Sequence, residues 1–141
     1  MRTSLIAAVV AVSAAIPGPG FAEGTDLGKN EYDRSCASCH GGMGKGDGPA
    51  AKSLAKPPAD LTKLSQNNSG VFPIARVYDV IDGRLQVIMH GTREMPVWGD
   101  VFRSELMARV PRESMSPELR DAMVRVRILM VIEYISKLQG K

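Results

Sequence analysis

The chain has 141 residues, 44% of them hydrophobic, and a formal net charge of +3. This length suits one ordinary domain with a packed core and excludes a large multidomain enzyme. The small charge provides neither the basic surface of a nucleic-acid-binding protein nor a strong steering field for charged partners.

The first 22 residues have the layout of a secretory signal peptide. A basic Met1-Arg2 start precedes an apolar run over residues 5–16, which is too short to span a bilayer. Gly20-Phe21-Ala22 then offers small residues where a signal peptidase cleaves. We expect cleavage after Ala22, export to the periplasm, and one domain over residues 23–141. An uncleaved membrane anchor is the alternative.

Residues 26–35 predict a short helix that leads into a compact group of reactive residues. That group is Cys36-Ala37-Ser38-Cys39-His40, a C-x-x-C-H sequence typical of covalent c-type haem attachment. Two thiols three positions apart can each add to one vinyl group of the same porphyrin. The histidine that follows can then bind iron from the proximal side.

Three other chemistries are open to Cys36, Cys39 and His40. A thioredoxin-type redox pair needs a βαβ context, which this region lacks. A structural zinc site needs a fourth ligand, for which only His90 remains. A disulfide, which two cysteines in an exported protein ordinarily form, leaves His40 without a role. Haem attachment is the interpretation that uses all three residues.

The middle of the chain predicts loops and short helices. Residues 41–48 are rich in glycine and predict a loop, residues 50–55 predict a helical turn ended by Pro57-Pro58, and residues 62–70 are polar and irregular. Apolar residues at helical spacing predict a helix over 74–82 with Gly83 as its C-cap. Another short helix is expected over 100–108, before Pro111.

The last helix is the clearest element of the sequence. Ser116 is its expected N-cap, Pro117 takes its first position, and Gly140 closes it. One stripe at helical spacing is expected to face the core and the first helix: Leu119, Met123, Val126, Met130, Tyr134 and Leu138. No strand-like alternation appears, so the fold class is all-α.

A methionine is the expected second iron ligand, because a haem that only transfers electrons is usually closed on both axial sides. Met43 is too close to His40 to reach the opposite ring face. Met107, Met123 and Met130 fall in predicted helices, where core packing is the simpler role.

Met95 differs from these methionines because Pro96 follows it. Proline restricts the preceding residue to extended conformations, which places the Met95 sulfur on a stiff loop. His90 is the alternative ligand and would give a bis-histidine haem of lower potential.

Taken together, these motifs resemble the class I cytochrome c family in its bacterial branch. They follow the family's order: C-x-x-C-H at 36–40, a glycine-rich loop over 41–51, a proline-containing loop over 57–62, Met-Pro-Val-Trp at 95–98, and a C-terminal helix around 131–135. The resemblance implies a small all-α cytochrome c fold with three to five helices wrapped around one covalently attached haem.

The resemblance also implies a role for each site residue. Cys36 and Cys39 carry the thioether links, His40 is the proximal iron ligand and Met95 the distal one. A backbone carbonyl near Pro57 or Pro58 accepts the outer N–H of His40. Glycine at position 28 implies a close crossing of the first and last helices.

The implied function is a periplasmic single-electron carrier with one haem c and unknown redox partner proteins. It implies no nucleic acid, no membrane span after cleavage, and no catalytic acid, base or nucleophile. One alternative is an electron-entry subunit of a dehydrogenase or oxidase complex. Another is an enzyme or gas-binding haem protein with an open iron position, which Met95 would close. Residues 99–116, absent from shorter members, form either a solvated surface or a docking surface for a redox partner.

Overall fold

The structure is a computed structural model of the chain and describes residues 26–85 and 95–140. Within these ranges all regular structure is helical. The elements are α1 (Leu27–Ser35), α2 (Ala37–His40), η1 (Ala51–Ser53), η2 (Leu61–Lys63), η3 (Gln66–Asn68), α3 (Ile74–Asp82), α4 (Trp98–Arg109), η5 (Arg112–Ser114) and α5 (Pro117–Lys137). The all-α class predicted from the sequence is confirmed.

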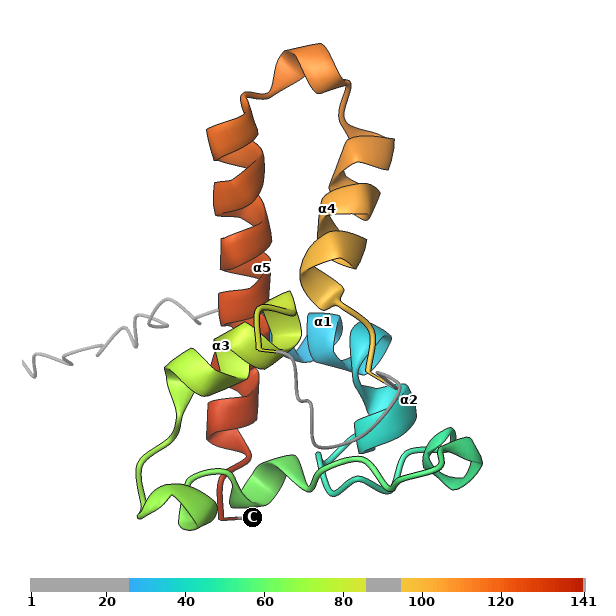
Figure 1. Cartoon of the computed structure of the whole chain (residues 1–141), viewed down its shortest axis with the longest axis vertical. Helices are drawn as coiled ribbons and strands as arrows, with labels where there is room; N and C mark the ends of the chain where they lie inside the picture. Colours follow the sequence, from blue (N-terminus) through green and yellow to red (C-terminus); the bar gives the residue numbers. More distant parts are fainter. Residues whose placement is uncertain (1–25, 86–94, 141) are drawn as a thin grey trace, which may run out of the picture.

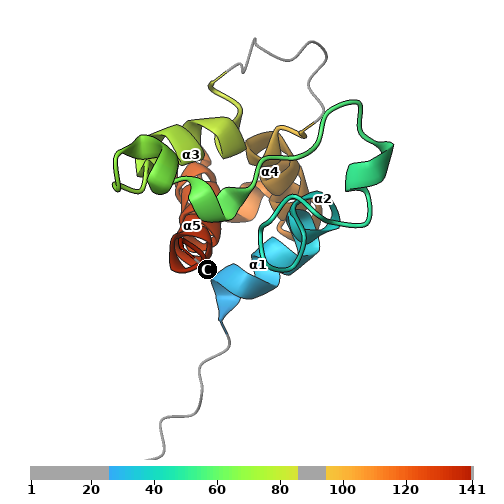
Figure 2. The same cartoon turned by 90° about the horizontal axis from the view of Figure 1, so that it is seen from below.

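Helix α5 is the element on which the others are assembled. It runs the length of the molecule, and α1, α3 and α4 all pack against it (Figure 1). The view along α5 places these three helices on one side of it (Figure 2). The upper part of α5 and α4 form a hairpin, joined by η5, that extends away from α1, α2 and α3 (Figure 1).

The core lies where α1 crosses the C-terminal half of α5, which is its lower part in Figure 1. Tyr32 is fully buried, and its ring lies 5.0 Å from that of Tyr134, measured between centroids. A Cβ on Gly28 would lie 2.2 Å from the carbonyl oxygen of Met130, so only glycine allows α1 to approach this closely. The expected crossing of the first and last helices is therefore present.

Capping residues determine where several of the helices begin and end. Asp26 and Ser116 accept hydrogen bonds from the N–H groups of Lys29 (2.9 Å) and Leu119 (3.2 Å), which fixes the starts of α1 and α5. Helix α3 has the predicted bounds, and Gly83 ends it with φ of 88°. Helix α4 begins earlier than predicted, at Trp98, because the Val97 carbonyl already accepts the N–H groups of residues 100 and 101.

The predicted core stripe of α5 is wrong over its first half. Leu119, Met123 and Val126 are 51%, 43% and 55% exposed, and only the last two members, Tyr134 and Leu138, are buried as expected. The buried face is instead made by residues 124, 128, 131, 132 and 135. Helix α5 is apolar on more than one side, so periodicity alone cannot identify the side that its neighbours cover.

Two further expectations from the sequence, one for Met107 and one for the segment over 62–70, differ from the structure. Met107, expected in the core, is 39% exposed on α4. The segment expected to be irregular over 62–70 contains the end of η2 and the whole of η3. Within the described ranges, no helix combines the length and hydropathy needed to cross a bilayer.

Candidate haem site

Cys36, Cys39 and His40 lie on a single helical turn. Cys36 ends α1 and begins α2, and its carbonyl accepts the N–H groups of Cys39 (3.1 Å) and His40 (2.9 Å). Both cysteines are half-buried free thiols. The backbone thus places two thiols and an imidazole on one face, since residues three and four apart are neighbours on a helix.

A backbone carbonyl from the proline-containing loop orients the His40 ring. His40 Nδ1 lies 3.0 Å from the carbonyl oxygen of Ala59, the residue after Pro58. A carbonyl can only accept, so Nδ1 carries the proton and Nε2 keeps a free lone pair. Burial lowers the pKa of His40, and the hydrogen bond to Ala59 opposes this only in part. A neutral imidazole with a free Nε2 is the form that binds iron.

The glycine-rich loop satisfies the end of α2 through backbone hydrogen bonds. The N–H of Gly46 donates to the His40 carbonyl (2.8 Å), and that of Gly48 donates to the Cys39 carbonyl (3.1 Å). A Cβ on Gly48 would lie 2.4 Å from the carbonyl oxygen of Ser38. Glycine is therefore required for the loop to approach closely enough to cap this turn.

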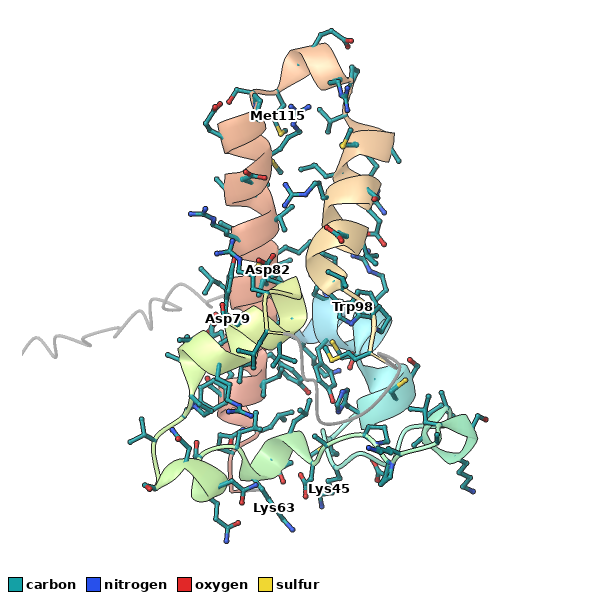
Figure 3. All side chains as sticks on the ribbon, viewed as in Figure 1. Lys45, Lys63, Asp79, Asp82, Trp98 and Met115 are labelled. Atoms are coloured by element: carbon teal, nitrogen blue, oxygen red, sulfur yellow. The ribbon has the colours of Figure 1, made fainter. Side chains whose placement is uncertain are left out.

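Met95 approaches the same core as Cys36 from a distant part of the chain. Both side chains are partly buried and pack against the core cluster, together with other partly buried apolar residues: Leu61, Leu64, Phe72, Val77, Tyr78 and Trp98. Trp98 begins α4 at the level of α1 (Figure 3). The ring of Trp98 lies 5.7 Å from that of Phe102. The segment that carries Met95 is thus anchored to the core directly after the methionine.

These residues fit a covalently attached haem. Two thiols can form thioethers, a neutral imidazole and a thioether sulfur can bind iron, and apolar side chains surround them. Burial, with a smaller effect from Glu31, raises the pKa of the Cys36 thiol to about 12. Burial thus favours the protonated form of this thiol.

Two of the sequence alternatives involve His90, which lies outside the described residues. In the part of the chain that the structure describes, no three His, Cys, Asp or Glu side chains come together as a metal-binding group. The described cysteines also form no disulfide.

An ionic network beside Cys36 was not predicted from the sequence. Glu31 is 7% exposed and accepts hydrogen bonds from Arg34, Ser35 and Arg127. Arg127 also donates to Glu105 (2.5 Å). The network ties α1, α4 and α5 together just before the turn that carries Cys36, Cys39 and His40. Glu31 and Arg127 are far apart in the sequence, so no local pattern could have revealed their contact.

The comparison with known protein families agrees with this site. The sequence matches the family model described as Cytochrome C oxidase, cbb3-type, subunit III over residues 23–110. No curated protein and no solved structure gives a significant match. The chain therefore belongs to the family of cytochrome c oxidase, cbb3-type, subunit III, whose cytochrome c domain carries covalently bound haem c and serves haem-based electron transfer.

Proposed function

We propose that the protein is a periplasmic single-electron carrier. In this proposal Cys36 and Cys39 form the thioether links to haem c, His40 is the proximal iron ligand and Met95 the distal one. The observation that carries the proposal is the His40 ring, which lies on the same helical turn as both cysteines and donates its Nδ1–H to the Ala59 carbonyl, so that Nε2 is left free. The haem iron would supply the chemistry by alternating between its ferric and ferrous states.

The protein's own residues then hold the iron ligands in position and shield the haem site from water. The Ala59 carbonyl fixes the orientation of the His40 ring and increases its basicity as a ligand. Gly46 and Gly48 fix the backbone of the haem-binding turn from the other side. The apolar residues around Met95 keep water away and so favour the less charged state of the site. Electron transfer requires no acid, base or nucleophile from the chain.

We also propose that residues 1–22 are a secretory leader and residues 23–141 the cytochrome domain. The family match begins at residue 23, directly after the expected cleavage site. Export also suits the cofactor, because covalent attachment prevents its loss outside the cytoplasm.

The attachment test uses the purified holoprotein. Intact mass should equal residues 23–141 plus one haem, and the haem should remain bound after acid–acetone extraction. Replacing both Cys36 and Cys39 with alanine should abolish the haem-stained band on a denaturing gel, whereas Met43→Ala, an exposed methionine in the same region, should keep it. Recovery of the porphyrin in the solvent from the unmodified protein would refute covalent attachment.

The distal ligand is tested by comparing Met95→Ala with His90→Ala. Iron bound by a thioether should show a weak near-infrared charge-transfer band in the ferric state. Met95→Ala should abolish this band, lower the potential and open the iron to carbon monoxide, while His90→Ala should leave all three unchanged. The opposite result would identify a bis-histidine haem, and rapid carbon monoxide binding by the unmodified protein would favour an open-site enzyme or sensor.

A second candidate is an electron-entry subunit of an oxidase complex, and the family description favours it. The haem chemistry would be the same, but the partner would be permanent. Purification of the native protein under mild conditions separates the two. A free carrier elutes without partner proteins, whereas a subunit elutes with the rest of its oxidase.

A further inference from the structure

Helix α5 carries a second apolar face on the side away from the core. Leu119, Ala122, Val126 and Leu129 recur at spacings of three and four residues, as a helix-pairing seam requires. All four are exposed, the leucines and the valine to between 48% and 55%. By helical geometry they lie on the side of α5 opposite the buried residues Val124 and Ile128, and their exposure shows that α1, α3 and α4 leave this side uncovered.

Charged residues border this face along one edge. Glu118 and Arg125 lie one turn before and one turn after Ala122, and together with Asp121 and Ala122 they line a shallow depression. Asp121 is already paired with Arg103 of α4. The edge is thus acidic towards the start of α5 and basic towards its middle.

We infer that the face formed by Leu119, Ala122, Val126 and Leu129 pairs with the same face of a second copy of this chain, in antiparallel orientation, with the two helices crossing at Ala122. In an antiparallel pair related by a twofold axis, equivalent edges meet with their directions reversed. Glu118 of one copy then lies opposite Arg125 of the other, twice in the interface.

The antiparallel arrangement that crosses at Ala122 also brings apolar residues of the two copies together. Crossing at Ala122 places the smallest side chain of the seam at the point of closest approach, and it places Leu119 against Val126 of the second copy. A parallel pair would bring the charged edge against the opposite edge of the seam, which carries Met123 and Met130. The charge pattern therefore selects the antiparallel arrangement.

The interface leaves the haem site accessible. Cys36 and Met95 pack against the core cluster, which includes Val124 and Ile128 on the opposite side of α5 from the exposed face. A dimer through this face would therefore carry two independent haem-binding domains.

The test measures the association of the haem-loaded mature protein by sedimentation, followed by haem absorbance. The unmodified protein should form a dimer. Glu118→Arg or Arg125→Glu should each raise the dimer Kd about tenfold or more, because two attractive pairs become repulsive. Val126→Glu should abolish the dimer, while Met107→Glu, an exposed methionine on α4, should not change it.

Charge exchange decides whether the partner is a second copy. The double variant Glu118→Arg/Arg125→Glu should recover the unmodified Kd, and an equimolar mixture of the two single variants should form a mixed dimer. An unmodified protein that stays monomeric, or a double variant that stays as weak as the single ones, would overturn the inference. A dimer that Val126→Glu does not weaken would show that the two copies associate through another surface and would also overturn the inference. Unchanged haem spectra and circular dichroism establish that each variant is folded.

Discussion

The two ends of α5 belong to one helix but are packed in different ways. Around its lower end, α1, α3 and the glycine-rich loop close over the helix, and Val131 and Leu138 are at most 3% exposed. Along its upper end α4 is the one described helix that lies beside it, and Leu119 and Val126 remain about half exposed. The lower end supports the turn that carries Cys36, Cys39 and His40, and the upper end extends beyond it.

This difference in packing between the two ends of α5 matches a difference in how precisely each region must be positioned. The turn that carries Cys36, Cys39 and His40 is held by hydrogen bonds to backbone groups of two loops and by glycine contacts that permit no added side chain. The hairpin is held to α1 through the side chains of Arg127, Glu105 and Glu31. A ligand set must be positioned within a fraction of an ångström, whereas a surface element needs only to remain attached.

The largest expected effect comes from truncating the buried face of α5 beside its exposed face. Ile128 is fully buried and Val126, two residues earlier, is 55% exposed. Ile128→Ala should lower the free energy of unfolding by about 3 kcal/mol, through lost burial and the cavity that remains. Val126→Ala should change it by less than about 0.5 kcal/mol, since an exposed site leaves no cavity.

Denaturant unfolding of the haem-loaded protein at low concentration measures both changes. Low concentration keeps the protein monomeric, so any association through Val126 does not contribute. Equal losses in the two variants would mean that α5 is buried on both faces, contrary to the observed packing.

A smaller but more local effect is expected in the glycine-rich loop. A Cβ on Gly48 would lie 2.4 Å and 2.6 Å from the carbonyl oxygens of Ser38 and Ala37, whereas a Cβ on Gly42 would meet nothing within 4 Å. Gly48→Ala should therefore destabilise the protein by about 2–3 kcal/mol and disturb the haem spectrum. Gly42→Ala should leave the spectrum unchanged and the stability within about 1 kcal/mol. A silent Gly48→Ala would show that the loop does not position the turn.

Structural features that depend only on residues close together in the sequence could be predicted from the sequence. The N-cap Ser116, the end of α3 at Gly83, and the helical class all follow from local chemistry. The grouping of Cys36 with Cys39 and His40 is likewise local, because spacing within one turn determines it.

Features that depend on distant segments could not be predicted. The carbonyl that meets His40 belongs to Ala59, 19 residues away, and only the loop could be named beforehand. The outward orientation of Leu119 and Val126 depends on which side of α5 the other helices cover. The pairing of Glu31 with Arg127 spans 96 residues and joins two helices that have no pattern in common.

The last prediction tests the attachment of the hairpin to α1 through Glu31. Burial alone would raise the pKa of this carboxyl, but hydrogen bonds from Arg127 and Ser35 hold it below its ordinary value of 4.5. A carboxyl with a lowered pKa in the folded state stabilises the protein above its unfolded pKa, and this stabilisation is lost as the pH falls through the lowered value. The contribution of Glu31 is therefore complete at pH 7 and declines below pH 4.5.

Glu31→Gln should lower the free energy of unfolding by about 2 kcal/mol at pH 7, because it removes the charge that Arg127 and Arg34 face. The loss is smaller than is usual for a buried pair, since Arg127 keeps Glu105 as a partner. The gap between variant and unmodified protein should narrow as the pH falls below 4.5, because Glu31 is protonated first in the unfolded state and then, at its lowered pKa, in the folded state. Asp33→Asn, which breaks an exposed pair with Lys29 on the same helix, should produce a much smaller gap. A Glu31→Gln deficit that stays constant down to pH 3 would mean that the side chain contributes through packing and not through its charge.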